Sequence, residues 1–201
     1  MIRILLADDQ ALIRGALATM LNLEPGLTVV AQVGRGDEVL PAAEEHKPDV
    51  ALIDVQMPGL DGLNAAAALH KAMPAVRIII CTTFGRPGYL ARAMAAGASG
   101  FVVKDAAPEY LIDAVRRVHA GLRVVDPGLA AESLVAGSST LTQREREVLV
   151  AAATGATVRD IAHSLHLSVG TVRNHLSSAI GKTGARTSSE AARIAESNGW
   201  L

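Results

Sequence analysis

Four short apolar runs, each followed at once by charged or hydroxyl side chains, constrain the fold of this chain most strongly. The polar residues are Asp8, Asp9, Asp54, Thr82 and Lys104, and the runs before them are residues 2–7, 50–53, 76–81 and 100–103. Runs of this length that are rich in β-branched residues are typical of buried parallel strands. Because the carboxyl ends of parallel strands meet at one edge of a sheet, these side chains should converge there. The pattern predicts a site for a metal cation and a phosphoryl group.

Helical patterns separate the apolar runs. A further strand is predicted at residues 28–33, and the predicted helices are residues 11–22, 37–45, 62–71, 87–96 and 108–120. Five strand–helix repeats in succession indicate an α/β fold with a doubly wound, five-stranded parallel sheet and helices on both faces. We assign residues 1–122 to this domain.

The periodic pattern changes after this domain. From Asp126 onward Pro, Gly, Ala and Ser dominate, so residues 123–139 are predicted to form a linker. Residues 140–201 then show the patterns of an all-α domain with four helices. Thr142 and Glu145 have the spacing of a capping box at the start of the first helix.

The middle of this second domain has the pattern of a helix-turn-helix. Two short helices, residues 158–164 and 169–181, are joined by a tight turn, and a last helix is predicted at residues 188–197. Residues 140–201 carry seven basic and five acidic side chains, which gives a net charge of +2. This weak positive charge is compatible with nucleic acid but does not establish such a partner.

Composition limits the protein classes that fit. Aromatic residues make up only 2% of the chain, so no aromatic stacking platform is expected. The longest apolar stretches are far shorter than the roughly 20 residues of a membrane helix. Cys81 is a lone cysteine inside an apolar run, which favours a core position in a reducing compartment. We therefore expect a cytoplasmic protein without a membrane partner.

The residue types at the predicted sheet edge fit phosphoryl transfer. A carboxylate at a strand end, such as Asp54, can attack phosphorus and form an acyl phosphate. Asp8 and Asp9 are placed to bring Mg²⁺, which prefers a few carboxylates together with water and phosphate oxygens. Lys104 and Thr82 would neutralise and hold the phosphoryl oxygens. The protein would modify itself, so we do not expect an enzyme that acts on a separate substrate.

The same residues carry a resemblance to a known family. Ala7-Asp8-Asp9, Asp54, Met57-Pro58-Gly59-Leu60-Asp61-Gly62, Thr82 and Lys104 resemble the receiver domain of bacterial two-component response regulators. The resemblance implies that Asp54 accepts a phosphoryl group from a cognate sensor histidine kinase. It also implies that Asp9, Asp54 and the Gln56 carbonyl ligate Mg²⁺, with Asp8 acting mainly through water. Thr82 and Phe101 would form a switch pair.

Residues 140–196 resemble the LuxR-type helix-turn-helix of the NarL/FixJ group. The matching positions are residues 141–149, Gly155, Ile161-Ala162, Leu165, Leu167-Ser168 and residues 171–176. In a major groove, Arg reads guanine and Asn reads adenine. The resemblance implies base contacts from Arg173, Asn174 and Ser177, and phosphate contacts from Arg159, Thr171 and Lys182. This chain has Lys104-Asp105 where many receivers have Lys-Pro, and this departure is also similar to the NarL/FixJ group.

The predicted function is a transcriptional regulator that binds double-stranded promoter DNA as a homodimer when Asp54 is phosphorylated. We expect the first and fifth helices to form the dimer surface, with Leu12, Ile13 and Ile112. Residues 84–89 further resemble the desaturase-regulating, DesR-like branch of the group.

Three alternatives differ from this prediction. A regulator that ignores phosphorylation would keep the first domain only for dimerisation. A phosphatase with an aspartate nucleophile would need a second acid two residues after its nucleophile, a spacing that Asp8-Asp9-Gln10 lacks. A ligand-sensing quorum regulator shares the helix-turn-helix, but this chain has few aromatic residues to line a lactone pocket.

Overall fold

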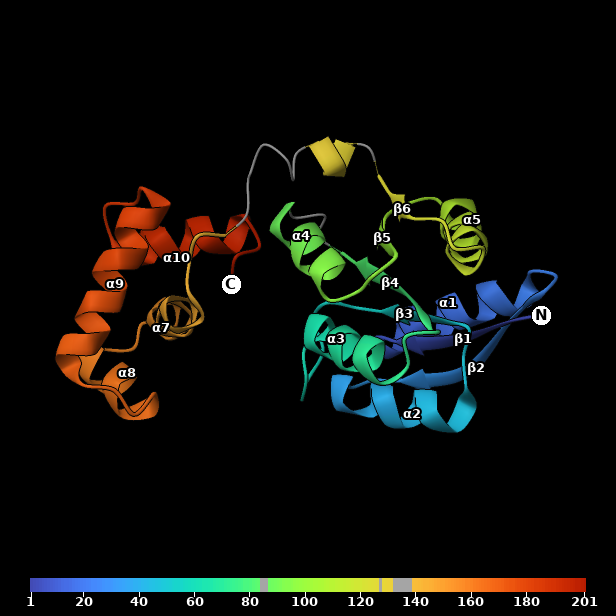
Figure 1. Cartoon of the computed structure of the whole chain (residues 1–201), viewed down its shortest axis with the longest axis horizontal. Helices are drawn as coiled ribbons and strands as arrows, with labels where there is room; N and C mark the ends of the chain where they lie inside the picture. Colours follow the sequence, from blue (N-terminus) through green and yellow to red (C-terminus); the bar gives the residue numbers. More distant parts are fainter. Residues whose placement is uncertain (84–86, 127, 132–138) are drawn as a thin grey trace. The chain divides into compact units, whose positions relative to one another are not determined.

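The computed structural model describes residues 1–83, 87–126, 128–131 and 139–201. They form two compact units, a sheet unit that ends at Ala131 and a helical unit that begins at Ser139 (Figure 1). Residues 84–86 of the DesR-like segment and residues 132–138 of the predicted linker lie outside the described residues. Within the described ranges, no helix is both long and apolar enough to cross a membrane.

The sheet unit is built on six parallel strands in the order β2-β1-β3-β4-β5-β6. The strands are β1 (Ile2–Ala7), β2 (Leu27–Val33), β3 (Val50–Ile53), β4 (Arg77–Thr82), β5 (Gly100–Val103) and β6 (Val124–Val125). The predicted doubly wound parallel sheet is confirmed, and β6 is an additional edge strand. β6 pairs Val125 with Phe101, inside the segment that the sequence assigned to the linker. A strand of two residues is too short to show an alternating pattern in the sequence. It forms because the free edge of β5 supplies hydrogen-bond partners.

Helices cover both faces of the sheet. They are α1 (Ala11–Leu23), α2 (Val39–His46), α3 (Gly62–Ala72), α4 (Pro87–Ala95) and α5 (Pro108–His119). Leu21 of α1 and Val115 of α5 are buried in one core with Leu52 of the sheet, and α2 and α3 pack beside each other on the other face (Figure 1). The core is mainly aliphatic, and Phe101 is its largest fully buried side chain.

The helix predicted at residues 37–45 begins differently in the structure. A single 3₁₀ turn, η1 (Gly36–Glu38), comes first, and the α-helix starts at Val39. Pro41 explains this start, because proline has no N–H and is tolerated only in the first turn of an α-helix.

The helical unit contains the four predicted helices. They are α7 (Gln143–Ala153), α8 (Val158–Ser164), α9 (Val169–Thr183) and α10 (Ser188–Ser197). The predicted capping box is confirmed, because the Glu145 N–H donates to the Thr142 side chain and the Thr142 N–H donates to the Glu145 carboxylate. α9 runs two residues further than predicted and ends at Gly184, whose φ of 67° is the left-handed conformation that glycine adopts easily.

α8 and α9 pack on α7 through apolar side chains. Val148, Ile161 and Val172 are at most 1% exposed and form one cluster. Leu176 and Ile180, which the sequence placed on the inner face of α9, are partly buried against the second cluster of the unit, which also contains Trp200. The inner face of α9 is therefore as predicted.

Candidate functional site

The strand order places an acidic cluster where the sheet changes direction. β1 and β3 are neighbours, but the helices that follow them lie on opposite faces, and α/β sheets bind ligands at such points. Carboxylate oxygens of Asp8, Asp9 and Asp54 lie within 4.8 Å of one another here. Asp8 and Asp54 are 1% and 4% exposed, whereas Asp9 is open to solvent. The strand-end acids therefore converge as predicted.

Lys104, directly after β5, provides a positive charge for two of these acids. Its Nζ lies 2.7 Å from an oxygen of Asp8 and 2.9 Å from an oxygen of Asp54. Burial raises the pKa of Asp54, and the Lys104 ammonium only partly offsets this effect. Burial also opposes the charge on Lys104, but its hydrogen bonds to Asp8 and Asp54 prevail and raise the pKa of Lys104. One ammonium thus pairs with two of the three neighbouring carboxylates, and negative charge is left over.

The cluster fits a divalent cation. Opposite ligands of an octahedral Mg²⁺ stand about 4.2 Å apart, because each bond is about 2.1 Å long. The oxygens of Asp8, Asp9 and Asp54 already lie within 4.8 Å of one another. All of them are hard oxygen donors, the kind that Mg²⁺ prefers. Gln56 follows Asp54 by two residues in the same loop, with an exposed side chain, and the role of its carbonyl stays a prediction.

The two residues of the predicted switch pair are buried in neighbouring strands. Thr82 ends β4 and is 1% exposed, and Phe101 lies in β5 and is fully buried. The Lys104 backbone N–H donates to the Thr82 carbonyl at 2.8 Å. This bond holds the ends of β4 and β5 together beside the acidic cluster.

Three contacts around the cluster were missed from the sequence. The Arg14 guanidinium of α1 donates to the Asp8 carbonyl and so holds the turn that carries Asp8 and Asp9. The Val55 N–H donates to Asp54 at 2.7 Å and fixes one carboxylate oxygen. A Cβ at Gly62 would stand 1.6 Å from the Asp54 carbonyl oxygen, so only glycine lets α3 start this close to Asp54. Arg14 was visible in the sequence only as an ordinary helix residue, and Gly62 only as part of the motif that carries the family resemblance.

Cys81 behaves as the predicted core residue. Its side chain is buried at 4% exposure, and burial raises the pKa of its thiol to about 12. The thiol therefore stays protonated at neutral pH and is a poor nucleophile.

In the helical unit, most of the predicted DNA-contacting residues lie on the open face of α9. Arg173, Asn174 and Ser177 are exposed, and Thr171 stands half-buried in the first turn beside the capping residue Ser168. Arg159 is exposed on α8. A polar face with one Arg and one Asn on a helix of this length fits a major groove.

Lys182 has a different setting from the other five residues. Its ammonium binds both carboxylate oxygens of the buried Glu145, at 2.9 and 2.7 Å. The Ser178 hydroxyl donates to the same carboxylate at 2.6 Å. The sequence indicated Glu145 only as a helix cap, because the capping partner is three residues away whereas Ser178 and Lys182 are distant in the chain.

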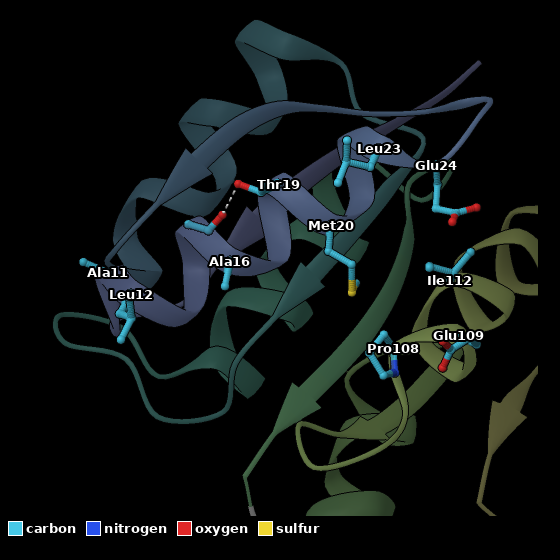
Figure 2. A pocket seen from close by; sticks show the side chains of 11 residues that line it. Ala11, Leu12, Ala16, Thr19, Met20, Leu23, Glu24, Pro108, Glu109 and Ile112 are labelled. Carbon is cyan, nitrogen blue, oxygen red and sulfur yellow. Dashed lines mark hydrogen bonds between the residues drawn. The ribbon is translucent and has the colours of Figure 1, made fainter.

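A groove of about 820 Å³ lies between α1 and α5 (Figure 2). Leu12 and Ile112, two of the residues predicted to form a dimer surface, line it, whereas Ile13 is not part of its lining. Leu12 and Leu23 protrude at 86% and 78% exposure, and Met20 lies between them on α1 (Figure 2). Leu23 and Met20 were not predicted as part of this surface, and Leu23 lies one residue beyond the helix predicted at residues 11–22.

Comparison with known proteins agrees with this architecture. Residues 4–116 match the response regulator receiver domain, and residues 139–195 match the bacterial regulatory proteins of the luxR family. Over the whole of both chains, the protein is 44% identical to the uncharacterised transcriptional regulatory protein YvfU and 40% identical to the transcriptional regulatory protein DesR, both from Bacillus subtilis. The crystal structure of the response regulator ChrA from a haem-sensing two-component system covers 100% of this chain and 98% of its own, with 30% identity and a TM-score of 0.59. The chain therefore belongs to the response regulators that join a receiver domain to a LuxR-type DNA-binding domain.

Proposed function

We propose that this regulator is switched by phosphorylation of Asp54 and then binds promoter DNA as a homodimer. The observation that carries the proposal is the cluster of the buried Asp8 and Asp54 with the exposed Asp9, into which Lys104 is bonded. Its excess of negative charge suits a divalent cation, and its position at the sheet edge gives a phosphoryl donor access. A cognate sensor histidine kinase is the proposed donor.

In this mechanism the chain's own residues position the reacting groups. The Val55 N–H holds one oxygen of Asp54, and the other oxygen attacks the phosphorus. The oxygen–phosphorus bond forms as the bond from phosphorus to the kinase histidine nitrogen breaks, and the electron pair of the broken bond stays on that nitrogen. Asp54 reacts as the ionised carboxylate and therefore loses no proton in this step. Lys104 turns to a phosphoryl oxygen, and Thr82 donates its hydroxyl to another.

The proposed metal is Mg²⁺, held by Asp8, Asp9, Asp54 and the Gln56 carbonyl. When bound, it would neutralise the charge between the carboxylates and the phosphoryl oxygens. The hydrogen bond from Arg14 to the Asp8 carbonyl supports this role, because it fixes the turn on which two of the ligands stand.

The groove between α1 and α5 is the proposed dimer surface, and its proposed occupant is a second copy of this chain. In a two-fold dimer the same patch must supply both the protruding and the receiving parts. Here protruding leucines, Leu12 and Leu23, flank the small residues Gly15, Ala16 and Thr19, which leave the groove open between them. Leu12 and Ile112 are therefore proposed interface residues, and Ile13 stays a prediction without a place in the groove.

The proposed DNA contacts follow the exposed face of α9. Arg173, Asn174 and Ser177 would reach base edges, and Arg159 and Thr171 would hold phosphates. Lys182 would add a phosphate contact only through the donor capacity that Glu145 leaves free. The low net charge of residues 140–201 supports the need for two copies on one DNA site.

Phosphorylation is tested with acetyl phosphate and Mg²⁺ on the intact protein. We expect a mass increase of one phosphoryl group that is absent in Asp54→Asn, because the variant lacks the carboxylate that is the proposed phosphoryl acceptor. Mass spectrometry of the intact protein measures the label. An unlabelled wild type whose DNA binding equals that of Asp54→Asn would favour the alternative of a phosphorylation-independent regulator.

The dimer surface is tested with a charge at its most exposed leucine. Leu12→Asp should weaken phosphorylation-dependent dimerisation by about tenfold or more, because the charge must be desolvated in the interface. Leu122→Asp is the matched control, since Leu122 is also an exposed leucine, at 53%, but lies outside the groove. Sedimentation equilibrium of the phosphorylated proteins measures the dissociation constants, and equal constants for both variants would exclude the groove.

A further inference from the structure

The helical unit holds a partly buried ion pair that joins α7 to α9. The Glu145 side chain is 5% exposed and accepts the Lys182 ammonium on both carboxylate oxygens. It also accepts the Ser178 hydroxyl and the Thr142 backbone N–H, each at 2.6 Å. Both oxygens of this carboxylate are therefore fully occupied inside the protein.

The anchored residues lie close to those that face DNA. Ser178 and Lys182 are four residues apart on α9 and so stand on the same side of the helix, one turn apart. Ser178 in turn follows Asn174 by one turn. A shift of the Glu145 contacts would therefore rotate or slide the segment that carries Asn174 and Ser177.

The same ion pair also offsets the positive charge of Lys182. A carboxylate, like a DNA phosphate, is an anionic hydrogen-bond acceptor. Glu145 already accepts hydrogen bonds that the Lys182 ammonium would otherwise donate to a phosphate. The Lys182 side chain is 32% exposed, so the ammonium stands near the surface and could turn to DNA if Glu145 released it. An ammonium whose charge is offset by a neighbouring carboxylate adds little to the attraction of phosphates.

We propose that Glu145 is a positioning residue for DNA recognition that fixes α9 through Ser178 and Lys182 and keeps Lys182 from acting as a full phosphate contact. The inference deepens the DNA contacts proposed above and rests on them. Its consequence is that release of Lys182 would increase the non-specific attraction to DNA and disturb the geometry of the base contacts.

Salt dependence separates this role from a merely structural one. Binding of the intact protein is measured by fluorescence anisotropy on two 30-base-pair duplexes, one taken unselected from a random pool and one selected from that pool by the wild type. Glu145→Gln frees Lys182, so the slope of log affinity against log salt should steepen by about 0.9, the value for one extra phosphate. Its preference for the selected duplex should fall about tenfold, since a misplaced base contact costs about 1–3 kcal/mol.

Lys182→Met gives the second half of the test. Its slope should differ from that of the wild type by less than about 0.3, whereas the matched control Arg159→Met, an exposed basic residue on α8, should flatten the slope by about 0.9. The double variant Glu145→Gln/Lys182→Met should return to the wild-type slope. These variants decide the question even if Glu145→Gln folds poorly, because Lys182→Met keeps the Thr142 and Ser178 bonds to Glu145.

The outcomes against the inference are distinct. If Lys182→Met flattens the slope as much as Arg159→Met does, Lys182 is a full phosphate contact and the inference is wrong. An unchanged slope in Glu145→Gln overturns it as well. If the wild type itself shows no salt-dependent binding, the proposed DNA contacts fail, and the inference fails with them.

Discussion

Each unit of the molecule contains a buried lysine–carboxylate pair, and the two pairs differ in how many donors each carboxylate receives. In the sheet unit, Lys104 is divided between Asp8 and Asp54, and burial raises the pKa of Asp54. In the helical unit, burial also opposes the charge on Glu145, but several hydrogen bonds, led by that of Lys182, lower its pKa to about 2. A buried carboxylate that receives fewer hydrogen bonds and keeps a raised pKa is open to a cation or a phosphoryl group. One whose oxygens are all bonded serves as a fixed part of the structure.

The largest effect is expected from removing the shared lysine. Lys104→Met leaves buried carboxylates without their cation and should lower the free energy of unfolding by about 3–5 kcal/mol. Lys182→Met should cost only about 1–3 kcal/mol, because Glu145 keeps its other hydrogen bonds. Urea unfolding followed by far-ultraviolet circular dichroism reports both units together, and fluorescence of Trp200, the single tryptophan, reports the helical unit alone, so the two signals together separate the units.

Mg²⁺ provides the control for this comparison. Mg²⁺ should recover part of the unfolding free energy lost in Lys104→Met, because a cation at the acidic cluster replaces the missing charge. It should not restore the unfolding free energy that the helical unit loses in Lys182→Met. Equal losses in both variants with no response to Mg²⁺ would contradict the difference between the two pairs.

The pH dependence of the helical unit should come next in size. The pKa of Glu145 falls from an ordinary 4.5 to about 2 on folding, so the ionised pair stabilises the fold above pH 4.5 and loses this effect as the pH falls toward 2. The loss should be roughly 3 kcal/mol, since each unit of pKa corresponds to about 1.4 kcal/mol. Urea unfolding followed by Trp200 fluorescence between pH 2 and 6 measures this loss, because this range includes both the unfolded and the folded pKa of Glu145. Glu145→Gln should lack this component, and parallel pH profiles for both proteins would contradict the assignment.

The smallest effect is expected one step away from the acidic cluster. Arg14→Leu should raise the Mg²⁺ concentration for half-maximal labelling by acetyl phosphate about tenfold, because the residues that support metal ligands typically matter by this amount. Arg116→Leu is the control, since Arg116 pairs at the surface with Glu24, away from the cluster, and its side chain is 48% exposed. The rate of labelling at increasing Mg²⁺ measures both, and the same value for both variants would show that the Arg14 bond does not support the ligands.

Sequence patterns predicted the sheet unit well because its information is local. A polar residue at the end of an apolar run can be placed at a sheet edge once the strands are parallel, and this holds for Asp8, Asp54 and Lys104. The contacts around these residues could not be predicted in the same way. The bond from Arg14 to the Asp8 carbonyl depends on the angle at which α1 leaves β1, which no local pattern encodes.

In the helical unit the limits of local patterns appear at Glu145. Its capping partner Thr142 is three residues away and was predicted, whereas Ser178 and Lys182 are 33 and 37 residues away and meet it only through the packing of α9 on α7. For the same reason Lys182 was predicted as a phosphate contact from its place on α9 alone. Leu12 and Ile13 look equivalent in the sequence, and only the rotation of α1 on the sheet separates the residue that lines the groove from the one that does not.

The edge strand β6 determines where the chain leaves the sheet unit. Val125 pairs in register with Phe101, so the last strand residue before the second half of the protein is hydrogen-bonded to the strand that carries one member of the proposed switch pair. A displacement of β5 therefore moves the starting point of the connecting segment together with it. The last strand of the sheet unit is thus anchored beside the buried Phe101, so the C-terminal part of this unit is tied to the strand that also lies next to the acidic cluster.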